Sequence, residues 1–373
     1  MQYNTLFVGM DVHKESFTLC CYDMSRDKVS YTQKTDADYT RVLQYLQTVR
    51  KAMGGDVQFV CGYEAGCLGY TLYHQLTKSR VQCELLAPST MMQAGGRKRV
   101  KTDRRDAERI AKCLAFHTYS PVHIPTDQDE KVKDYLRMRD DHKLALKKVK
   151  QQILAFCLRH GYVFTGTSTH WTESHLKWLR QLEGEGLYNE ILSEYLLTYQ
   201  TLKEKIERMD RRIEELAQED AYREPVKKLS CFLGIKTHTA LATIVEVGDF
   251  KRFPTADRFA SYLGLVPGER SSGDSQIRLG ITKAGNCHVR TLLTEAAQCF
   301  SRGRVGYKSR ALKKRQEGNT PEVIAYADRA NERLRRKYYQ MVLGKNKKAN
   351  VAKTAVAREL ACFIWGMMTD HIA

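Results

Sequence analysis

The chain has 373 residues, more than one hydrophobic core usually holds, so two or three domains are expected. It carries 61 Lys and Arg against 43 Asp and Glu, and this net charge of +18 suits a polyanion such as nucleic acid better than a small metabolite. No run approaches the roughly 18 to 20 apolar residues of a membrane-spanning helix, and the start lacks the layout of a signal peptide. We therefore expect a cytoplasmic protein with no membrane contact.

The 11 cysteines raise the question of zinc sites or disulfides, but none of them forms a CxxC pair. Cys20 and Cys21 are adjacent, and Cys61 and Cys67 lie six residues apart. We therefore expect reduced and mostly buried thiols.

Residues 1–125 are expected to form an α/β domain, with a mixed sheet covered by helices. Apolar runs predict strands over residues 6–11, 16–22, 57–64 and 81–86, the first two forming a hairpin. Helical spacing of apolar positions predicts helices over residues 39–53 and 69–78.

Residues 126–225 are expected to form a helical coiled-coil region that serves dimerisation. One stretch has apolar residues at alternating spacings of three and four, as a coiled-coil seam requires: Leu192, Tyr195, Tyr199, Leu202, Ile206, Met209, Ile213 and Leu216. A looser version of this pattern runs from Val132 to Phe156. The two stretches can pair within the chain or across a dimer, and the spacing favours neither arrangement.

Residues 226–373 are expected to form a mostly helical domain with glycine turns. Within it, residues 302–348 hold 15 Lys or Arg against 4 Asp or Glu, which predicts additional nucleic-acid surface. Four tyrosines of this segment are either available to stack on bases or buried in helices: Tyr307, Tyr326, Tyr338 and Tyr339. A last apolar helix, from Val351 to about Met368, is expected to pack on the same domain.

Four acidic residues form the candidate chemical site: Asp11, Glu64, Asp103 and Asp106. The first two each end a predicted strand, and the last two lie three apart at the start of a predicted helix, so they share one face. Gathered carboxylates repel one another unless a cation neutralises them, and hard oxygen ligands select Mg²⁺ or Mn²⁺. Two such ions can cut a phosphodiester together. Taken singly, the acids are also explained as turn, surface and helix N-terminal residues.

A basic run surrounds the helical pair of acids and is expected to bind phosphates beside the metal. It consists of Arg97, Lys98, Arg99, Lys101, Arg104, Arg105 and Arg109. A solvated basic face is the alternative explanation.

These motifs together resemble one family. GMDVHKE around Asp11, YEAG at Glu64 and KTDRRDA at Asp103 resemble DEDD-type insertion-sequence transposases and recombinases related to the Piv DNA invertase. The segments LSCFLGIKTHTALATIVEVGDFKRF, SYLGLVPGERSSG and RLGITKAGNCHVRTLLTEAA follow that family's C-terminal transposase domain in order. The resemblance implies an N-terminal domain with the ribonuclease-H-like (RuvC-like) fold of Holliday-junction resolvases, and a C-terminal transposase domain with a helix-hairpin-helix-like element.

The resemblance also implies a serine recombinase of the bridge-RNA-guided type. Ser272, directly before Gly273, matches the catalytic serine, which attacks a phosphodiester and holds the DNA end as a phosphoserine. Ser271 is the rival nucleophile, and an ordinary polar turn is the structural alternative. Where the family commonly has a PGIG-like hairpin, residues 233–236 read LGIK, without the proline and the second glycine. The remaining nucleic-acid-binding candidates are Lys236, Arg278, Lys283 and Arg290.

The implied partners are target and donor DNA and a structured noncoding guide RNA, encoded by the element, that carries the sequence specificity. The metal and the serine are implied to meet in a composite site contributed by different protomers of a homo-oligomer. A dimer and a tetramer built as a dimer of dimers both satisfy this expectation, and the protein is expected to lie at the nucleoid.

Three other functions fit parts of the sequence. A metal-only Holliday-junction resolvase-like nuclease would use the four acids and keep the third domain for DNA binding. An actin-like ATPase or sugar kinase also opens with an apolar strand, Gly-x-Asp and a hairpin, but it needs later glycine-rich phosphate loops, and the DxxD helix has no role there. A non-catalytic RNA-binding scaffold would tolerate loss of all four acids.

Overall fold

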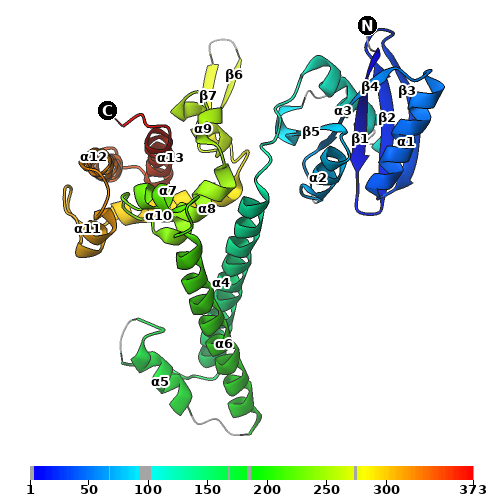
Figure 1. Cartoon of the computed structure of the whole chain (residues 1–373). Coiled ribbons are helices and arrows are strands. Elements are labelled where there is room, and N and C mark those ends of the chain that lie inside the picture. The colour runs from blue at the N-terminus through cyan, green and yellow to red at the C-terminus, as the bar shows by residue number, and fades with distance from the viewer. Residues whose placement is uncertain are drawn as a thin grey trace. The chain divides into compact units, whose positions relative to one another are not determined.

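The computed structural model describes residues 4–66, 68–91, 102–166, 169–182, 186–272 and 275–372, with backbone alone for Asn4, 269–272 and 275–278. The chain separates into two compact units, Met1–Ile124 and Pro125–Ala373 (Figure 1). The boundary between them lies beside the predicted end of the first domain at residue 125. The further division predicted at residue 225 stays a prediction.

The first unit is built on a five-stranded mixed sheet with the strand order β3-β2-β1-β4-β5. Its strands are β1 (Asn4–Val12), β2 (Ser16–Asp23), β3 (Lys28–Asp36), β4 (Val57–Glu64) and β5 (Gln82–Leu86). Strands β1, β2 and β3 are antiparallel neighbours, while β4 runs parallel to both β1 and β5. The predicted mixed sheet and its four predicted strands are confirmed.

The sequence prediction missed strand β3. This strand follows the β1–β2 hairpin directly, at a place where a helix was expected. It lies at the edge of the sheet, and most of its side chains are exposed. An edge strand of this kind needs few apolar residues, so KVSYTQKTD gives a weak periodic signal.

Helices cover both faces of this sheet. They are α1 (Tyr39–Ala52), α2 (Thr71–Lys78) and α3 (Asp103–Phe116), with a short 3₁₀ turn η1 (Pro88–Thr90). Along β1, Leu6, Val8 and Met10 are buried with the apolar residues of α1 and α2. Phe7 packs instead with the buried residues of α3. Since side chains alternate along a strand, odd-numbered residues of β1 face α3.

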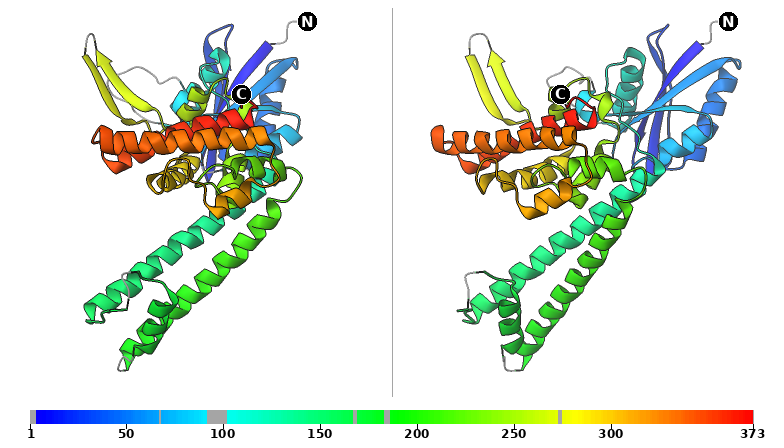
Figure 2. Two further views of the ribbon diagram at one scale, coloured as in Figure 1. Left: turned by 90° about the vertical axis from the view of Figure 1, so that its left-hand side faces the viewer. Right: turned by 60° about the vertical axis from the view of Figure 1, so that its left-hand side comes forward.

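The second unit begins with a long helical hairpin. It consists of α4 (Asp127–Arg159) and α6 (Leu187–Leu216), with α5 (Glu173–Gln181) between them, and the two long helices lie side by side (Figures 1 and 2). The start of α4 is buried with the end of α6, as shown by Leu136 and Ile213. The end of α4 is buried with the start of α6, as shown by Ile153 and Leu192. The predicted apolar seam of α6 is therefore buried against α4, and the two stretches pair within the chain in antiparallel fashion, while dimerisation through this region stays a prediction.

The remaining elements of this unit form a mostly helical body. They are α7 (Arg223–Leu229), α8 (Thr237–Val247), η2 (Phe250–Arg252), α9 (Ala256–Tyr262), β6 (Pro267–Ser272), β7 (Ser275–Ile281), α10 (Cys287–Ala297), η3 (Gln298–Ser301), α11 (Arg310–Gln316), α12 (Pro321–Tyr339), η4 (Gln340–Gly344) and α13 (Ala349–Met368). As predicted, the last helix packs on this body: Leu360 and Ile364 of α13 are fully buried in its core.

The basic segment 302–348 is partly structural. Tyr326 and Tyr338 belong to the buried core, so these two tyrosines are helix aromatics and do not offer their faces to bases. The ring of Tyr307 is exposed, and the hydroxyl of Tyr339 donates a hydrogen bond to the carbonyl oxygen of Gly303 at 2.8 Å. Arg335 is also buried, and it donates to the carbonyl oxygen of Tyr307 at 3.2 Å.

Two further expectations concern thiols and membranes. Seven cysteines are free and buried: Cys20, Cys21, Cys61, Cys83, Cys113, Cys157 and Cys231. This confirms the expected buried thiols, and Cys67 lies outside the described residues. Among the helices of the described chain, none combines the length and apolar character needed to cross a membrane.

A buried carboxylate ties the helical hairpin to the body of the second unit. The side chain of Glu246 on α8 is 2% exposed and accepts hydrogen bonds from Arg137 Nε at 2.8 Å and Asn286 Nδ2 at 3.1 Å. Burial raises the pKa of Glu246, but the hydrogen bond from Arg137 and the charges of Lys133 and Arg137 outweigh burial, so the pKa lies below its ordinary value.

Replacing Glu246 by alanine should lower the free energy of unfolding by about 3 kcal/mol, because Lys133, whose side chain is 14% exposed, and the half-exposed Arg137 lose a buried counter-charge. Chemical denaturation at neutral pH measures this loss. Because the folded-state pKa is lowered, the stabilisation is present above the ordinary pKa of 4.5 and is lost as the pH falls through the lowered value. The exposed pair of Arg212 and Glu215 is the control, and Glu215→Ala should cost less than about 1 kcal/mol. Equal losses for the two variants would contradict the prediction.

Candidate metal centre

Two of the four acids lie side by side at the ends of neighbouring parallel strands. Met10 of β1 pairs with Tyr63 of β4, so the residues that follow them, Asp11 and Glu64, are neighbours in the sheet. Because side chains alternate between the two faces of a strand, those of Asp11 and Glu64 both point toward α3. Strand pairing thus places together two carboxylates that are far apart in the sequence.

The first turn of α3 carries the other two acids. Thr102 caps this helix, and its hydroxyl accepts a hydrogen bond from the backbone N–H of Arg105 at 3.4 Å. The cap starts the helix at Asp103, so Asp103 and Asp106 both lie in the first turn, where carboxylates are favoured by the helix dipole. Farther along α3, Ile110, Ala111 and Leu114 are buried.

A pair of glycines lets α3 approach the sheet closely. Gly9 of β1 and Gly62 of β4 are register partners on the face that α3 covers. A Cβ atom on Gly9 would lie 2.0 Å from the carbonyl oxygen of Ala107 and 2.5 Å from the backbone nitrogen of Ala111. Any larger residue must therefore displace the helix backbone, which carries Asp103 and Asp106.

The centre concentrates negative charge around Asp11, whose side chain is 16% exposed. Burial raises the pKa of Asp11 above its ordinary value, His13 opposes this rise, and the charges of Asp106 and Asp103 add to it. Ligand atoms of Asp11 and Asp103 lie within 4.8 Å of each other and the charge of Asp106 also acts on Asp11, an arrangement that favours a bound cation.

Basic side chains contact the other acids. Nη2 of Arg109 lies 3.0 Å from Oε2 of Glu64 and 3.4 Å from Oδ1 of Asp106, so one guanidinium links β4 to α3. Nζ of Lys34 on β3 lies 3.4 Å from Oδ2 of Asp103. Together with the register of β1 and β4 and the closeness of Asp11 to Asp103, these contacts show that the structure brings all four predicted acids to one edge of the sheet.

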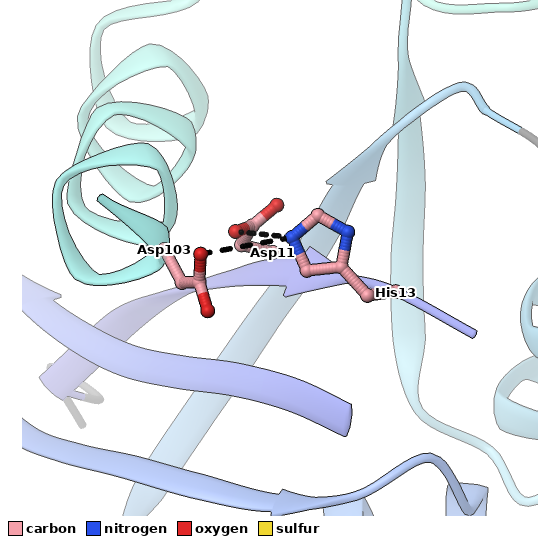
Figure 3. Close-up of side chains that lie close together, drawn as sticks. All are labelled: Asp11, His13 and Asp103. Carbon is pink, nitrogen blue, oxygen red and sulfur yellow. Dashed lines mark hydrogen bonds and ion pairs between the residues drawn. The ribbon is translucent and has the colours of Figure 1, made fainter. Parts of the chain in front are cut away.

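The sequence prediction overlooked His13, which follows directly after β1. Its Nε2 lies 3.1 Å from Oδ2 of Asp11 and 3.8 Å from Oδ1 of Asp103 (Figure 3). The available signal was its spacing, because residues two apart on an extended chain point to the same side.

The donor set fits a divalent metal ion. Asp11, His13 and Asp103 each offer one ligand atom, and these three atoms lie within 4.8 Å of one another. With metal–ligand bonds of about 2.1 Å, two donors of an octahedral ion stand about 3.0 Å apart when adjacent and about 4.2 Å apart when opposite. The separations of His13 Nε2 from Asp11 Oδ2, 3.1 Å, and from Asp103 Oδ1, 3.8 Å, lie in this range.

Gly9→Ala should disrupt both the fold and the centre. We expect a loss of about 1–3 kcal/mol or more in the free energy of unfolding, because the new methyl group overlaps the backbone of α3. We also expect weaker Mn²⁺ binding, because a displaced α3 moves Asp103 and Asp106 away from Asp11. Thermal unfolding and a Mn²⁺ titration measure the two effects.

The matched control for Gly9 is Gly280, a glycine of β7 with open space around its Cβ position. Gly280→Ala should change the free energy of unfolding by less than about 1 kcal/mol and leave Mn²⁺ binding unchanged. Unaltered stability and metal binding in Gly9→Ala would show that the close approach of α3 does not position the acids.

The other predicted site residues are described to different extents. Arg97, Lys98, Arg99 and Lys101 lie outside the described residues, as do the side chains of Ser272 and Arg278. The backbone of Ser272 ends β6, where it pairs with Ser275 of β7. Arg104, Arg105, Lys236 and Lys283 are exposed. Arg290 uses Nη1 to donate to the carbonyl oxygens of Leu263 at 2.9 Å and Ala284 at 3.0 Å.

The predicted helix-hairpin-helix-like element falls on α7, α8 and the turn between them. Gly234 in this turn has a φ of +85°, and a Cβ atom there would lie 2.4 Å from the carbonyl oxygen of Ala296. This glycine is therefore needed for the turn, although the proline of the family pattern is absent. Ile235 is fully buried, and the exposed Lys236 directly precedes α8.

A mixed sheet that gathers acids at one edge, within a strongly basic chain, is typical of metal-dependent enzymes that act on nucleic acid. Two family models match the chain: one described as a transposase, of the DEDD type of IS110, over residues 8–160, and one described as the transposase IS116/IS110/IS902 family over residues 226–314.

Relatives extend this similarity over the whole chain. The putative transposase y4qE of Sinorhizobium fredii is 33% identical over 99% of this chain and 90% of its own length. The transposase of insertion sequence element IS1533 of Leptospira borgpetersenii is 30% identical over 89% of this chain and 95% of its own length. The transposase of element IS1111A of Coxiella burnetii is 26% identical over 79% of this chain and 78% of its own length. The chain belongs to the IS116/IS110/IS902 family of transposases.

Proposed function

We propose that this protein cuts and rejoins DNA strands as the transposase of an insertion sequence, using divalent metal held by Asp11, Glu64, Asp103 and Asp106. The observation that carries the proposal is the convergence of these acids, from two parallel strand ends and one helix start, at a single edge of the sheet. We also propose a ribonuclease-H-like, RuvC-like fold for the first unit. The strand order β3-β2-β1-β4-β5, with α3 packed on one face of the sheet, supports this fold.

Each group of the centre has a role in this reaction. Mg²⁺ or Mn²⁺, when bound, would supply Lewis acidity for cutting the phosphodiester. Asp11 and Asp103, which offer ligand atoms within 4.8 Å of each other, would hold the ion together with Glu64 and Asp106, and Arg109 would orient these last two through its two contacts. Arg104 and Arg105 are exposed on α3, beside the acids, and so are available to bind phosphate oxygens of the DNA.

We further propose Ser272 as the nucleophile. Its hydroxyl oxygen forms a new ester bond to the phosphorus, the bond from phosphorus to one DNA oxygen breaks, and the serine proton passes to a base or to solvent. The phosphoserine conserves the energy of the phosphodiester, so the reverse exchange with a new DNA end needs no ATP. Support comes from the family match over residues 226–314, which includes this serine.

The proposed partners are target and donor DNA, a structured noncoding guide RNA and further copies of the chain. The net charge of +18 supports polyanionic partners. A protein that leaves sequence reading to RNA needs backbone and shape contacts more than base-reading side chains, which this charge provides. We propose a dimer or a dimer of dimers, with the acids and Ser272 of a composite site supplied by different protomers.

Trapping of a covalent adduct tests the proposal. Purified protein is incubated with DNA carrying the element's ends, RNA transcribed from its flanks and Mg²⁺ or Mn²⁺, then denatured and digested for mass spectrometry. We expect a DNA-linked peptide that contains Ser272 and forms only with metal present. DNA cutting without any adduct would instead favour a metal-only nuclease, which the acid cluster by itself also supports.

A further inference from the structure

The candidate metal centre contains a nitrogen donor beside its carboxylates. We propose that Nε2 of His13 is a direct ligand, together with Asp11 and Asp103, of a divalent ion in the centre. We also propose that this ligand makes the site prefer Mn²⁺ to Mg²⁺. The inference rests on the proposed function in one respect, because it takes these two aspartates as metal ligands.

The position of His13 supports a role as ligand. Its Nε2 faces both carboxylates, at 3.1 Å from Asp11 and 3.8 Å from Asp103, and these three side chains converge from the end of β1 and the start of α3 (Figure 3). Its backbone N–H donates to the carbonyl oxygen of Ser16 at 3.0 Å, so the turn between β1 and β2 fixes the residue. The side chain is 52% exposed, so packing does not prevent the small ring movement that coordination requires.

The chemistry of the donors sets the metal preference. Mg²⁺ takes oxygen ligands almost exclusively and dehydrates reluctantly, so an imidazole nitrogen adds little to its binding. Mn²⁺ accepts carboxylates as readily and, as a first-row transition ion, also binds imidazole, more weakly than Zn²⁺ or Cu²⁺ but better than Mg²⁺ does. A centre with two carboxylates and one imidazole on the same ion should therefore bind Mn²⁺ in preference to Mg²⁺. A centre made of carboxylates alone distinguishes these two ions only weakly.

Metal titrations of the full-length protein test the inference. Free Mn²⁺ is followed by its electron paramagnetic resonance signal, and Mg²⁺ affinity is obtained by competition. Because loss of an outer-shell partner alone weakens metal binding about 10–100-fold, His13→Ala should lower Mn²⁺ affinity at least about tenfold. Mg²⁺ affinity should fall less than about threefold. His117→Asn is the matched control: it removes an exposed histidine of the same unit, keeps a residue that tolerates its φ of +50°, and should change neither affinity.

A second variant separates coordination from hydrogen bonding. His13→Gln keeps a side-chain N–H that can donate to Asp11 but has no imidazole nitrogen, so it should lose Mn²⁺ preference as His13→Ala does. Pulsed electron paramagnetic resonance should show a nitrogen coupled to Mn²⁺ in the wild type and not in either variant. Absence of nitrogen coupling in the wild type, or an equal loss of Mn²⁺ and Mg²⁺ affinity in His13→Ala, would overturn the inference.

Asp11→Asn, titrated in parallel, distinguishes this inference from the proposed function. If Asp11→Asn abolishes Mn²⁺ binding while His13→Ala leaves the preference unchanged, the acids hold the metal and only the role of His13 is refuted. If Asp11→Asn leaves binding intact, the metal centre itself is misplaced, and the proposed function fails with it.

Discussion

Ser272→Ala should abolish both the covalent adduct and strand exchange. The alanine side chain has no oxygen to form the ester with phosphorus, so exchange should fall by at least about 10⁴-fold, as expected when a nucleophile is removed. DNA and RNA affinities should stay within about threefold of the wild type, because one hydroxyl adds little to binding dominated by phosphate contacts. A labelled DNA substrate, its RNA and gel analysis under denaturing conditions measure cutting and exchange separately.

Neighbouring serines provide the controls for this experiment. Ser271→Ala and Ser275→Ala should retain the adduct, since we assign the attacking oxygen to Ser272 alone. If Ser271→Ala loses the adduct and Ser272→Ala keeps it, the nucleophile is the preceding serine. If Ser272→Ala still cuts DNA at the wild-type rate, the protein acts as a metal-only nuclease, and the phosphoserine mechanism is wrong.

Asp11→Asn should reduce cutting and exchange by about 10²–10³-fold, because the metal that stabilises charge on the reacting oxygens loses an enclosed ligand. The substitution preserves shape, so the fold should be retained. Without metal, the variant should unfold at the same temperature as the wild type or higher, because the cost of burying the Asp11 charge and its repulsion by Asp106 and Asp103, which together outweigh its contact with His13, are removed. Single-turnover cutting and thermal unfolding in a chelator measure these opposite effects.

The control for Asp11 is Asp56, an exposed acid that precedes β4 at the opposite end of that strand from Glu64. Asp56→Asn should leave cutting within about twofold of the wild type, as a surface substitution away from the centre. RNA binding should be intact in both variants. Full recombination by Asp11→Asn would refute the metal centre.

If Asp11→Asn loses activity while its stability is unchanged or raised, Asp11 serves the metal centre and not the fold. Acids that only served the fold, for instance as helix N-terminal residues, would reduce stability when neutralised. A gain in stability, by contrast, indicates that the neighbouring carboxylates of the centre destabilise the folded protein when no cation is bound to neutralise them.

Local patterns in the sequence determined much of this protein. Four strands, the helices of the first unit and the coiled-coil seam from Leu192 to Leu216 follow from periods of two, of 3.6 and of seven residues. The sequence also predicted that Asp103 and Asp106 share one face of a helix, because residues three apart on a helix do so independently of the rest of the chain. Strand ends also identified Asp11 and Glu64 as candidates.

Only the tertiary structure decided which distant residues meet. The register of β1 with β4 makes Asp11 and Glu64 neighbours, and the Gly9 contact brings α3 to them. Packing of the sheet and α3 also brings Lys34 and Arg109 into contact with the acids. It places His13 next to the carboxylates of Asp11 and Asp103. None of this follows from periodicity, because a period describes neighbours along one segment, while strand pairing and helix docking join segments tens of residues apart.

The helical hairpin and the basic segment show the same limit. The seam of α6 was evident from spacing, but its antiparallel partner within the chain, α4, was decided by burial of both apolar stripes in common cores. Likewise, the charge of residues 302–348 was visible in the sequence, whereas packing determined that Tyr326 and Tyr338 are buried. The sequence therefore determined which segments are helices and strands and which acids are candidates, and long-range packing determined the composition of the centre.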